Sequence, residues 1–283
     1  MKKQMDGIRT ISDLSQAQML GEQELIDACF AQVSILPDLR NYLKWLFDNG
    51  VTTEVHSKLQ RRKGRELGIH PSTICKTPVC LLKIYYECTG KVDPLREYDQ
   101  KSQVTFDIGT LMHDTMQTWL TDMFEGQIKV EAPLKNKKLH ITGHTDALFT
   151  FPSTRFILEL KSIKEGGNYG WERVQLKPME DNVRQAHVYM AIEDVPFANV
   201  LYMGKNNSDY KEHPIMFNNA MWEGMLHNII EPVVEAAYNK GQIMPANPGW
   251  NCKWCDFLHG CDAGRRKQQD AKRATSRTSR VGR

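Results

Sequence analysis

Two carboxylates and one lysine between residues 146 and 161 could together support the hydrolysis of a phosphodiester bond. Asp146 lies in one predicted strand, and Glu159 and Lys161 lie in the next. Carboxylates that converge from neighbouring strands can bind a divalent metal ion, which orients and activates a water molecule. A lysine beside them can stabilise the negative charge that develops on the phosphate. The simpler alternative is that Glu159 and Lys161 form an ion pair on a half-exposed sheet.

The strand that carries Glu159 indicates why the charged residues would act together. Side chains of a strand alternate between its two faces, so Glu159 and Lys161 share one face, and Phe156, Leu158 and Leu160 point to the other. An unpaired charge in such an apolar strand is costly. A cation between Asp146 and Glu159 would remove that cost. Oxygen ligands supplemented by one imidazole suit Mg or Mn.

The spacing of apolar residues predicts the elements that position these side chains. Alternation with a period of two over residues 127–164 predicts three consecutive strands, and helical periodicity appears before and after them. A polar loop is expected at 163–175. The predicted helices cover 16–49, 70–90 in part, 107–124, 178–192 and 218–240, and two later strands cover 198–205 and 212–217. This order predicts an α/β core with a helical domain before it.

Polar residues on two of these helices could reach the same site. Gly109 and His113 form the pattern G-x-x-x-H on the helix before the strands, for which Asp107 is the expected N-cap. Gln185 and Tyr189 are four residues apart on the helix after the strands, so they project from one face. Each feature alone has an ordinary surface or core explanation. Their order around the two carboxylates favours one shared site.

Together the motifs G-x-x-x-H, GHTD, ELK and QAHVY resemble those of the PD-(D/E)XK nuclease superfamily, in its RecB-like iron-sulfur exonuclease branch, over residues 70–262. The resemblance implies a restriction-endonuclease-like core, with a mixed sheet flanked by helices. It also implies a catalytic set, Asp146, Glu159, Lys161, Gln185 and Tyr189, and metal ligands His113, Asp146, Glu159 and the carbonyl of Leu160. One departure is that Thr145, not proline, precedes the first carboxylate.

The C-terminal segment NCKWCDFLHGC contains a C-x2-C-x5-C cluster formed by Cys252, Cys255 and Cys261. In a protein expected to be intracellular, such thiols are more typical of metal binding than of disulfides. A fourth ligand would come from the cysteines at 29, 75, 80 or 88. Cys80 is favoured because it is expected in the first turn of a helix that begins at Thr77-Pro78, where the helix N-terminus stabilises a thiolate.

Zinc and a 4Fe-4S cluster both accept four thiolates, and the spacing leaves both open. The resemblance extends to the CRISPR-associated RecB-like exonucleases and the nuclease domain of AddB, where one cysteine precedes the nuclease core and three follow it. It therefore implies a structural 4Fe-4S cluster bound by Cys80, Cys252, Cys255 and Cys261.

Composition and charge place the chain among ordinary globular proteins with a basic end. Of 283 residues 41% are hydrophobic, no apolar run is long enough to span a membrane, and no signal peptide is expected. Residues 265–283 hold eight basic residues and one acidic residue, so they are expected to be disordered, as a solubilising end or a phosphate-binding arm. The expected domains are an N-terminal helical domain (1–100), a nuclease core (101–245), an iron-sulfur cysteine segment (246–264) and a basic tail (265–283).

These features predict a Mg- or Mn-dependent deoxyribonuclease, an exonuclease on single-stranded DNA or DNA ends, in the cytoplasm of a prokaryotic or phage-infected cell. A helicase, recombinase or integrase would be its partner in repair or recombination, and no membrane partner is expected. The alternatives are an endonuclease with the same core, or an inactive DNA-binding adaptor protein. Basic residues at 58–65 and the tryptophans 171, 250 and 254 could contact DNA, although core packing explains each tryptophan equally well.

Overall fold

The computed structural model describes residues 7–51, 66–91, 100–166 and 170–281. The chain forms two compact units. The first consists of Met1–Gly64, Gln100–Lys135 and Gly143–Trp222, and the second of Arg65–Asp99, Asn136–Thr142 and Glu223–Arg283. In the described part of the chain, no helix combines the length and the apolar character that crossing a membrane requires.

A five-stranded mixed sheet is the centre of the first unit. The strands lie side by side in sequence order: β1 (Ile128–Asn136), β2 (Ile141–Thr150), β3 (Arg155–Ile163), β4 (Phe197–Gly204) and β5 (Tyr210–Met216). β3 pairs antiparallel with β2 and parallel with β4, and β4 pairs antiparallel with β5. These strands agree with the alternation in the sequence, and the predicted class, an α/β core with a mixed sheet flanked by helices, is confirmed.

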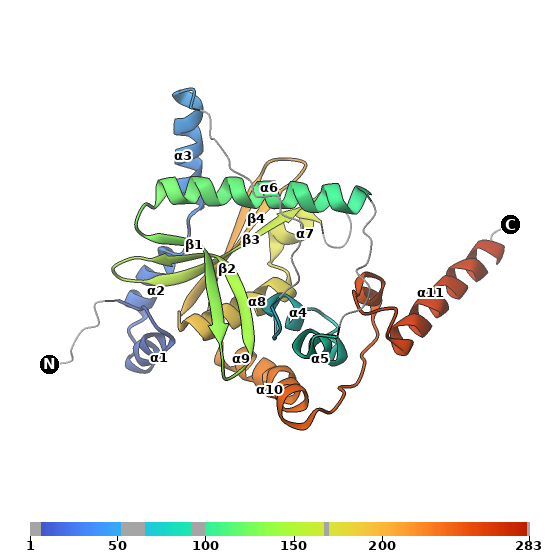
Figure 1. Ribbon diagram of the computed structural model, residues 1–283. Coiled ribbons are helices and arrows are strands. Elements are labelled where there is room, and N and C mark those ends of the chain that lie inside the picture. Colours follow the sequence, from blue (N-terminus) through green and yellow to red (C-terminus); the bar gives the residue numbers. More distant parts are fainter. Residues whose placement is uncertain (1–6, 52–65, 92–99, 167–169, 282–283) are drawn as a thin grey trace. The chain divides into compact units, whose positions relative to one another are not determined.

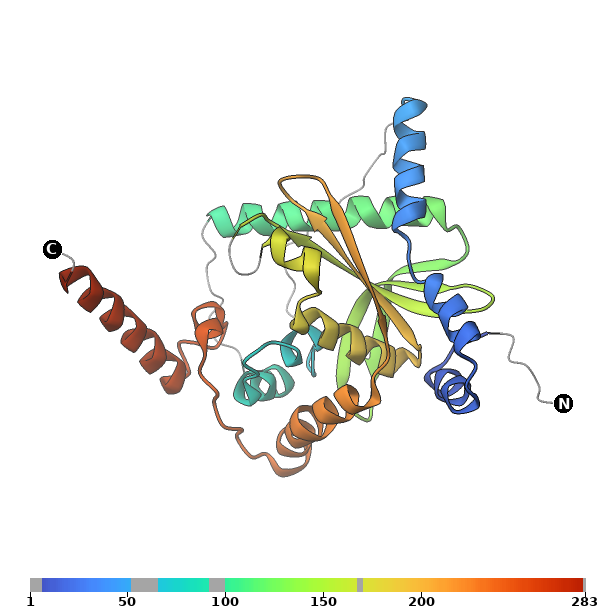
Figure 2. The ribbon, with the colours of Figure 1, turned by 180° about the vertical axis from the view of Figure 1, so that it is seen from behind.

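Helices α6 (Gln100–Met123) and α8 (Glu180–Glu193) cover opposite faces of this sheet (Figures 1 and 2). α6 packs Met116 and Leu120 into the core cluster that contains Leu158 and Leu160 of β3. α8 lies on the other face, where Asn182 Nδ2 donates a hydrogen bond to Tyr202 Oη at 2.8 Å. The connection from β3 to the parallel β4 therefore runs through α8, as parallel neighbours require.

Three N-terminal helices join the same core: α1 (Ile11–Leu20), α2 (Gln23–Ala31) and α3 (Leu36–Asp48). The carboxylate of Glu212 in β5 fixes the start of α3, because its Oε2 accepts hydrogen bonds from the backbone N–H groups of Ile35 and Leu36 at 3.0 and 3.2 Å. Ser34 Oγ donates to Oε1 of the same carboxylate. This satisfies N–H groups that a helix start leaves without partners inside the helix.

The compact units differ from the expected domain boundaries at 100 and 245. Residues 1–100 were expected to form a separate helical domain, but α1–α3 bury their apolar residues beside Phe149 and Phe156 of the sheet. Residues 66–91 instead belong with the C-terminal part, because Leu82 and Tyr86 form an apolar cluster with Ala236. Apolar contacts between segments distant in sequence thus override the order of the chain.

The second unit contains α4 (Pro71–Ile74), α5 (Leu81–Thr89) and the C-terminal helices. The helix expected at 218–240 is present as a continuous series, with wider π-helical turns at η1 and η2. Its pieces are α9 (Asn219–Met225), η1 (Leu226–Ile230), α10 (Glu231–Val234) and η2 (Glu235–Lys240), and the short helix η3 (Trp250–Trp254) and α11 (Asp262–Val281) follow.

Several helix boundaries differ from those predicted from the sequence. Asp107 lies inside α6, which begins at Gln100, so it is not the N-cap of that helix. Cys80, not Thr77, is the N-cap of α5. The loop expected at 163–175 contains a short helix, α7 (Trp171–Leu176).

The tail expected to be disordered is instead the helix α11, drawn in red in Figure 1. Its alanine, arginine, lysine and glutamine residues have high intrinsic helix propensity, and no proline interrupts them. Asp262 in its first turn complements the helix dipole. Local helix propensity therefore supports a helix here, although the segment has no apolar face. The low hydrophobicity of the segment had suggested disorder instead.

Candidate active site

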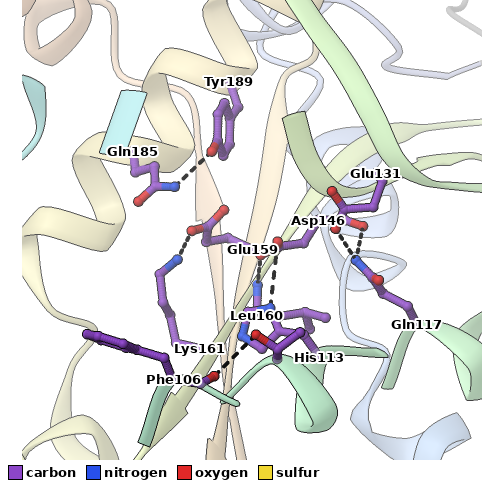
Figure 3. Close-up of polar contacts among 11 residues, drawn as sticks. Phe106, His113, Gln117, Glu131, Asp146, Glu159, Leu160, Lys161, Gln185 and Tyr189 are labelled. Carbon is purple, nitrogen blue, oxygen red and sulfur yellow. Dashed lines mark hydrogen bonds and ion pairs between the residues drawn. The ribbon is translucent and has the colours of Figure 1, made fainter. Parts of the chain in front are cut away.

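The predicted carboxylates lie where β2 and β3 separate. Regular pairing of these strands ends at Ala147 and Leu158. Beyond that pair, Asp146 Oδ2 accepts a hydrogen bond from the backbone N–H of Leu160 at 2.6 Å (Figure 3). The side chain of Asp146 thus provides the acceptor for a strand N–H, and its carboxylate is held beside the backbone of Leu160.

Glu159 and Lys161 form an ion pair on the face of β3 that α8 covers. Glu159 is 1% exposed, whereas Lys161 is partly exposed. Burial by itself would lower the pKa of Lys161, but the charges of Glu159 and Asp146 outweigh it, so the pKa of the ammonium group is raised. The site therefore keeps one positive charge between two carboxylates.

His113 approaches the carboxylates from α6, on the opposite face of the sheet. Its Nδ1 lies 3.8 Å from Asp146 Oδ1. Burial lowers the pKa of His113, and the charge of Asp146 opposes this only in part. A lowered pKa favours the neutral imidazole, which is the form that binds metals. His113 thus lies near Asp146 at the point where β2 and β3 have separated.

The glycine of the G-x-x-x-H pattern has a steric role on α6. A Cβ at Gly109 would lie 3.3 Å from Ser162 Oγ and 3.5 Å from Lys205 Nζ. Its absence lets the helix approach the ends of β3 and β4. This close approach brings His113, one turn later, beside the site.

Gln185 and Tyr189 lie one turn apart on α8, as predicted. Gln185 Nε2 donates a hydrogen bond to Tyr189 Oη at 2.8 Å, and both side chains are buried. Figure 3 shows the two residues on the same side as the pair formed by Glu159 and Lys161. The structure therefore brings every sequence-predicted residue of this site into one locality of the first unit.

Sequence reasoning missed two residues of the site, Gln117 and Glu131. Gln117 Nε2 donates to the backbone oxygen of Asp146 at 3.0 Å and to Glu131 Oε1 at 2.7 Å. Glu131 has a positive φ of 47°, which is unusual for a residue with a side chain. Burial raises the pKa of Glu131, and the charge of Asp146 raises it further. The position of Gln117, four residues after His113 on α6, was the available signal.

The donor groups near the separation of β2 and β3 are of the types that Mg or Mn prefers, although, among the described residues, they are not placed as a metal-binding group. They comprise two carboxylates, a backbone carbonyl at Leu160 and a neutral imidazole, and the buried carboxylate of Glu159 already lies beside a positive charge. Among the side chains that the structure describes, no group of three or more His, Cys, Asp or Glu is placed so that it could hold a metal ion.

The four cysteines that were expected to share a metal (Cys80, Cys252, Cys255 and Cys261, here the four-cysteine group) all belong to the second unit, but within the described part of the chain they are not placed as a metal-binding group. Backbone N–H groups donate to two of the sulfur atoms: Gly249 to Cys252 Sγ at 3.3 Å, and Gly264 to Cys261 Sγ at 3.4 Å. A Cβ at Gly264 would lie 3.5 Å from Cys261 Sγ and 3.8 Å from Cys252 Sγ, so these two sulfurs flank the same glycine.

Cys255 and Cys80 are the other two members of the four-cysteine group. Burial raises the pKa of Cys255 to about 11, the N–H of Phe257 lowers it, and the charge of Cys80 raises it, which indicates that the two sulfurs are neighbours. Cys80 is the N-cap of α5, as its expected position at the helix start requires. The other three cysteines of the chain, at positions 29, 75 and 88, are buried.

Side chains of the C-terminal segment bind the backbone that precedes Cys80. Trp250 Nε1 donates to the carbonyl oxygen of Thr77 at 3.1 Å, Asn251 Nδ2 to that of Pro78 at 3.0 Å, and Asn247 Nδ2 to that of Val79 at 2.9 Å. The segment that carries three cysteines is thus fixed to the segment that carries the fourth. This arrangement fits a structural role for the group.

The residues predicted to contact DNA differ in their exposure to solvent. The basic residues at 58–65 lie outside the described residues. Trp171 is buried in the first unit, in accord with core packing. Trp250 and Trp254 are 53% and 51% exposed in the second unit.

Comparisons with known proteins give no family for this chain. No family model matches the sequence, and no curated protein matches it. Among solved structures, SSO0001 matches with a TM-score of 0.42 and 15% identity, over 80% of this chain and 96% of that one.

Two exonucleases also match in structure. LHK-Exo, an alkaline exonuclease from Laribacter hongkongensis solved in complex with dAMP, matches with a TM-score of 0.41 and 14% identity, over 60% of this chain and 85% of that one. A phage related exonuclease from Haemophilus somnus 129PT matches with a TM-score of 0.39 and 14% identity, over 61% of this chain and 92% of that one. Identities and TM-scores this low carry no argument about the activity of this chain.

Proposed function

We propose that this protein is a metal-dependent deoxyribonuclease that hydrolyses phosphodiester bonds, an exonuclease on single-stranded DNA or DNA ends. The observation that carries this proposal is the placement of Asp146, Glu159, Lys161 and His113 around the point where β2 and β3 separate. The motifs that contain these residues resemble the PD-(D/E)XK nucleases in their RecB-like branch.

Each residue has a chemical task in this proposal. His113, Asp146, Glu159 and the carbonyl of Leu160 would hold Mg or Mn, which when bound polarises a phosphoryl oxygen and lowers the pKa of a water ligand. The hydrogen bond from Leu160 keeps one oxygen of Asp146 fixed and leaves Oδ1 facing His113. Glu159 is held on a rigid central strand, so its position needs little reorganisation.

Lys161 would stabilise the charge that develops on the phosphate and orient the attacking water. Its ammonium group lies between two carboxylates and stays charged, so it acts as a hydrogen-bond donor rather than as a base. Gln185 and Tyr189 are mutually hydrogen-bonded and buried, so they would shape the active site against the DNA.

The four-cysteine group would hold a 4Fe-4S cluster with a structural role, with zinc as the alternative. Support comes from the backbone N–H groups directed at the sulfurs and from the fixing of residues 77–79 to the C-terminal segment. Hydrogen bonds to cluster sulfurs are a usual means of tuning such sites. The visible absorption of protein purified without oxygen distinguishes the two metals, since iron-sulfur protein is brown and zinc protein is colourless.

The decisive experiment measures cleavage of labelled DNA with added Mg or Mn. We expect the wild-type chain and the control Asp38→Ala, which changes an exposed carboxylate, to cut DNA, and Asp146→Ala to be inactive. Equal activity of wild type and Asp146→Ala would refute the nuclease. Binding without cleavage by the wild type would support an inactive DNA-binding adaptor protein instead.

A second substrate pair separates exonuclease from endonuclease. An exonuclease needs a free end, so we expect degradation of linear single strands and no cleavage of circular single strands of the same sequence. Cleavage of the circles would support an endonuclease. The partner of this protein, a helicase, recombinase or integrase, can then be sought by comparing the DNA ends that each of these proteins produces with the ends that this protein degrades.

A further inference from the structure

The cysteine segment carries an exposed aromatic and cationic surface that the proposed active site does not use. Trp254 and Trp250 belong to η3, and about half of each side chain is exposed. Lys253 Nζ lies 5.0 Å from the centre of the Trp254 ring. Large exposed aromatic residues are informative because most tryptophans are largely buried.

The backbone holds this surface in place. Cys252 and Cys255 bracket Lys253 and Trp254, and Cys252 Sγ accepts the N–H of Gly249. Trp250 donates from its indole nitrogen to the carbonyl of Thr77, which fixes one edge of the ring. The Trp250 ring therefore has little freedom to lose when a ligand stacks on it.

The surroundings of these rings favour a polyanion. Residues 250–273 contain six basic residues and three acidic ones, and Arg265, Arg266 and Lys267 at the start of α11 are exposed. Aromatic rings alternating with cations on a positively charged surface are typical of single-strand binding. A duplex has no free base face to stack on an exposed indole, so the arrangement suits unpaired bases.

We propose that the segment Trp250–Trp254 is a binding surface for single-stranded DNA, with a base stacked on Trp254 and a phosphate contacting Lys253. This inference deepens the proposed nuclease function by assigning part of its substrate binding to the second unit. The surface would select substrates in which the strand is already unpaired.

The test measures binding without cleavage, by fluorescence anisotropy of a labelled oligo(dT) strand with full-length protein and no added divalent ion. We expect Trp254→Ala to raise the Kd about fivefold to a hundredfold, the range for loss of one stacked base. Trp254→Phe keeps a stacking face and retains most of the affinity. Lys253→Gln reduces the slope of log Kd against log salt by about 0.7, as expected for one contact to a single-strand phosphate.

Controls separate this surface from a general loss of structure. Trp45→Ala removes a tryptophan that is 52% exposed on α3 of the first unit, and it should leave the Kd unchanged. A duplex of the same length should bind Trp254→Ala and wild type equally. The proposal is overturned if Trp254→Ala binds oligo(dT) like wild type, or if Trp45→Ala or the duplex shows the same loss.

The outcome is independent of whether the chain cuts DNA. If the chain never cleaves DNA but binds oligo(dT) through Trp254, the binding surface is supported and the nuclease function is refuted. If the chain cleaves DNA and Trp254→Ala binds oligo(dT) as well as wild type, the nuclease function is supported and the binding surface is refuted. Thermal unfolding of Trp254→Ala and Trp254→Phe shows whether either variant has lost its fold.

Discussion

Asp146 Oδ2 accepts the backbone N–H of Leu160 at 2.6 Å, so one carboxylate both completes the edge of a strand and faces His113. The hydrogen bond stabilises the fold, whereas the negative charge would serve the proposed metal binding. The two contributions respond differently to substitution, because an amide preserves the acceptor and removes the charge.

Asp146→Asn and Asp146→Ala should therefore differ in stability and agree in activity. We expect both to cut DNA at least about a hundredfold more slowly, since each removes an anionic metal ligand. Asp146→Ala should also lose about 1–3 kcal/mol of unfolding free energy, because the N–H of Leu160 loses its acceptor. Urea unfolding and single-turnover cleavage measure the two effects. Wild-type activity in Asp146→Asn would contradict the assigned ligand.

Lys161→Met should make the protein depend on divalent ions for stability. Without the ammonium group Glu159 is a buried carboxylate that has lost an ion-pair partner, which costs about 3–5 kcal/mol. Added Mn should raise the unfolding temperature of Lys161→Met more than that of wild type, because the ion replaces the missing charge. Lys44→Met removes an exposed ion pair with Asp48 and should show little change. The same Mn response in all three proteins would argue against an ion at Glu159.

Glu212→Gln should destabilise the first unit. Glu212 accepts N–H groups at the start of α3, and Asn199 Nδ2 also donates to it at 2.9 Å. Loss of its charge should cost about 1–2 kcal/mol, through weaker hydrogen bonds and a lost interaction with the helix dipole. Glu125→Gln, which changes an exposed carboxylate, is the matched control in urea unfolding. Equal stability of the two variants would show that this cap is unimportant.

His187 predicts how stability varies with pH. Burial lowers the pKa of His187, although its hydrogen bond to the carbonyl of Val183 acts in the opposite direction. Its Nε2 accepts the N–H of Asn218, which requires that nitrogen to be unprotonated. Because the unfolded chain takes up a proton near pH 6.5 and the folded chain only at lower pH, stability falls as the pH drops below about 6.5.

Urea unfolding of wild type and His187→Gln at pH 7.5 and 5.5 tests this prediction. The wild type should lose more stability than the variant on acidification. Burial also lowers the pKa of His213, so part of the pH dependence should remain in the variant. A variant with the wild-type loss would show that His187 does not contribute.

On the proposal of a metal bound by the four-cysteine group, Cys255→Ser should remove that metal and weaken DNA binding, while Cys88→Ser should keep the metal. Cys88 is buried and interacts with Tyr238, and it is not one of the four proposed ligands. Iron and zinc content per chain, with the absorption spectrum, measures the difference. A Cys255→Ser protein with full stability and full metal content would contradict the structural role.

The sequence determined those elements whose signal is local. Alternation over 127–164 located three strands, and helical periodicity located α8 and the series from α9 to η2, because these periods follow directly from backbone geometry. The residue types and spacing of Asp146, Glu159 and Lys161 likewise identified the candidate chemistry. Boundaries such as the start of α6 were less well determined, since capping signals occur at several positions.

Only the tertiary structure decided which segments share a core and where the strands part. Where β2 and β3 separate, His113 of α6 lies near Asp146, and Gln117 links the backbone of Asp146 to Glu131. The grouping of residues 66–91 with the C-terminal cysteines depends on apolar burial between distant segments. Such contacts are set by packing in three dimensions, which no local period in the sequence records.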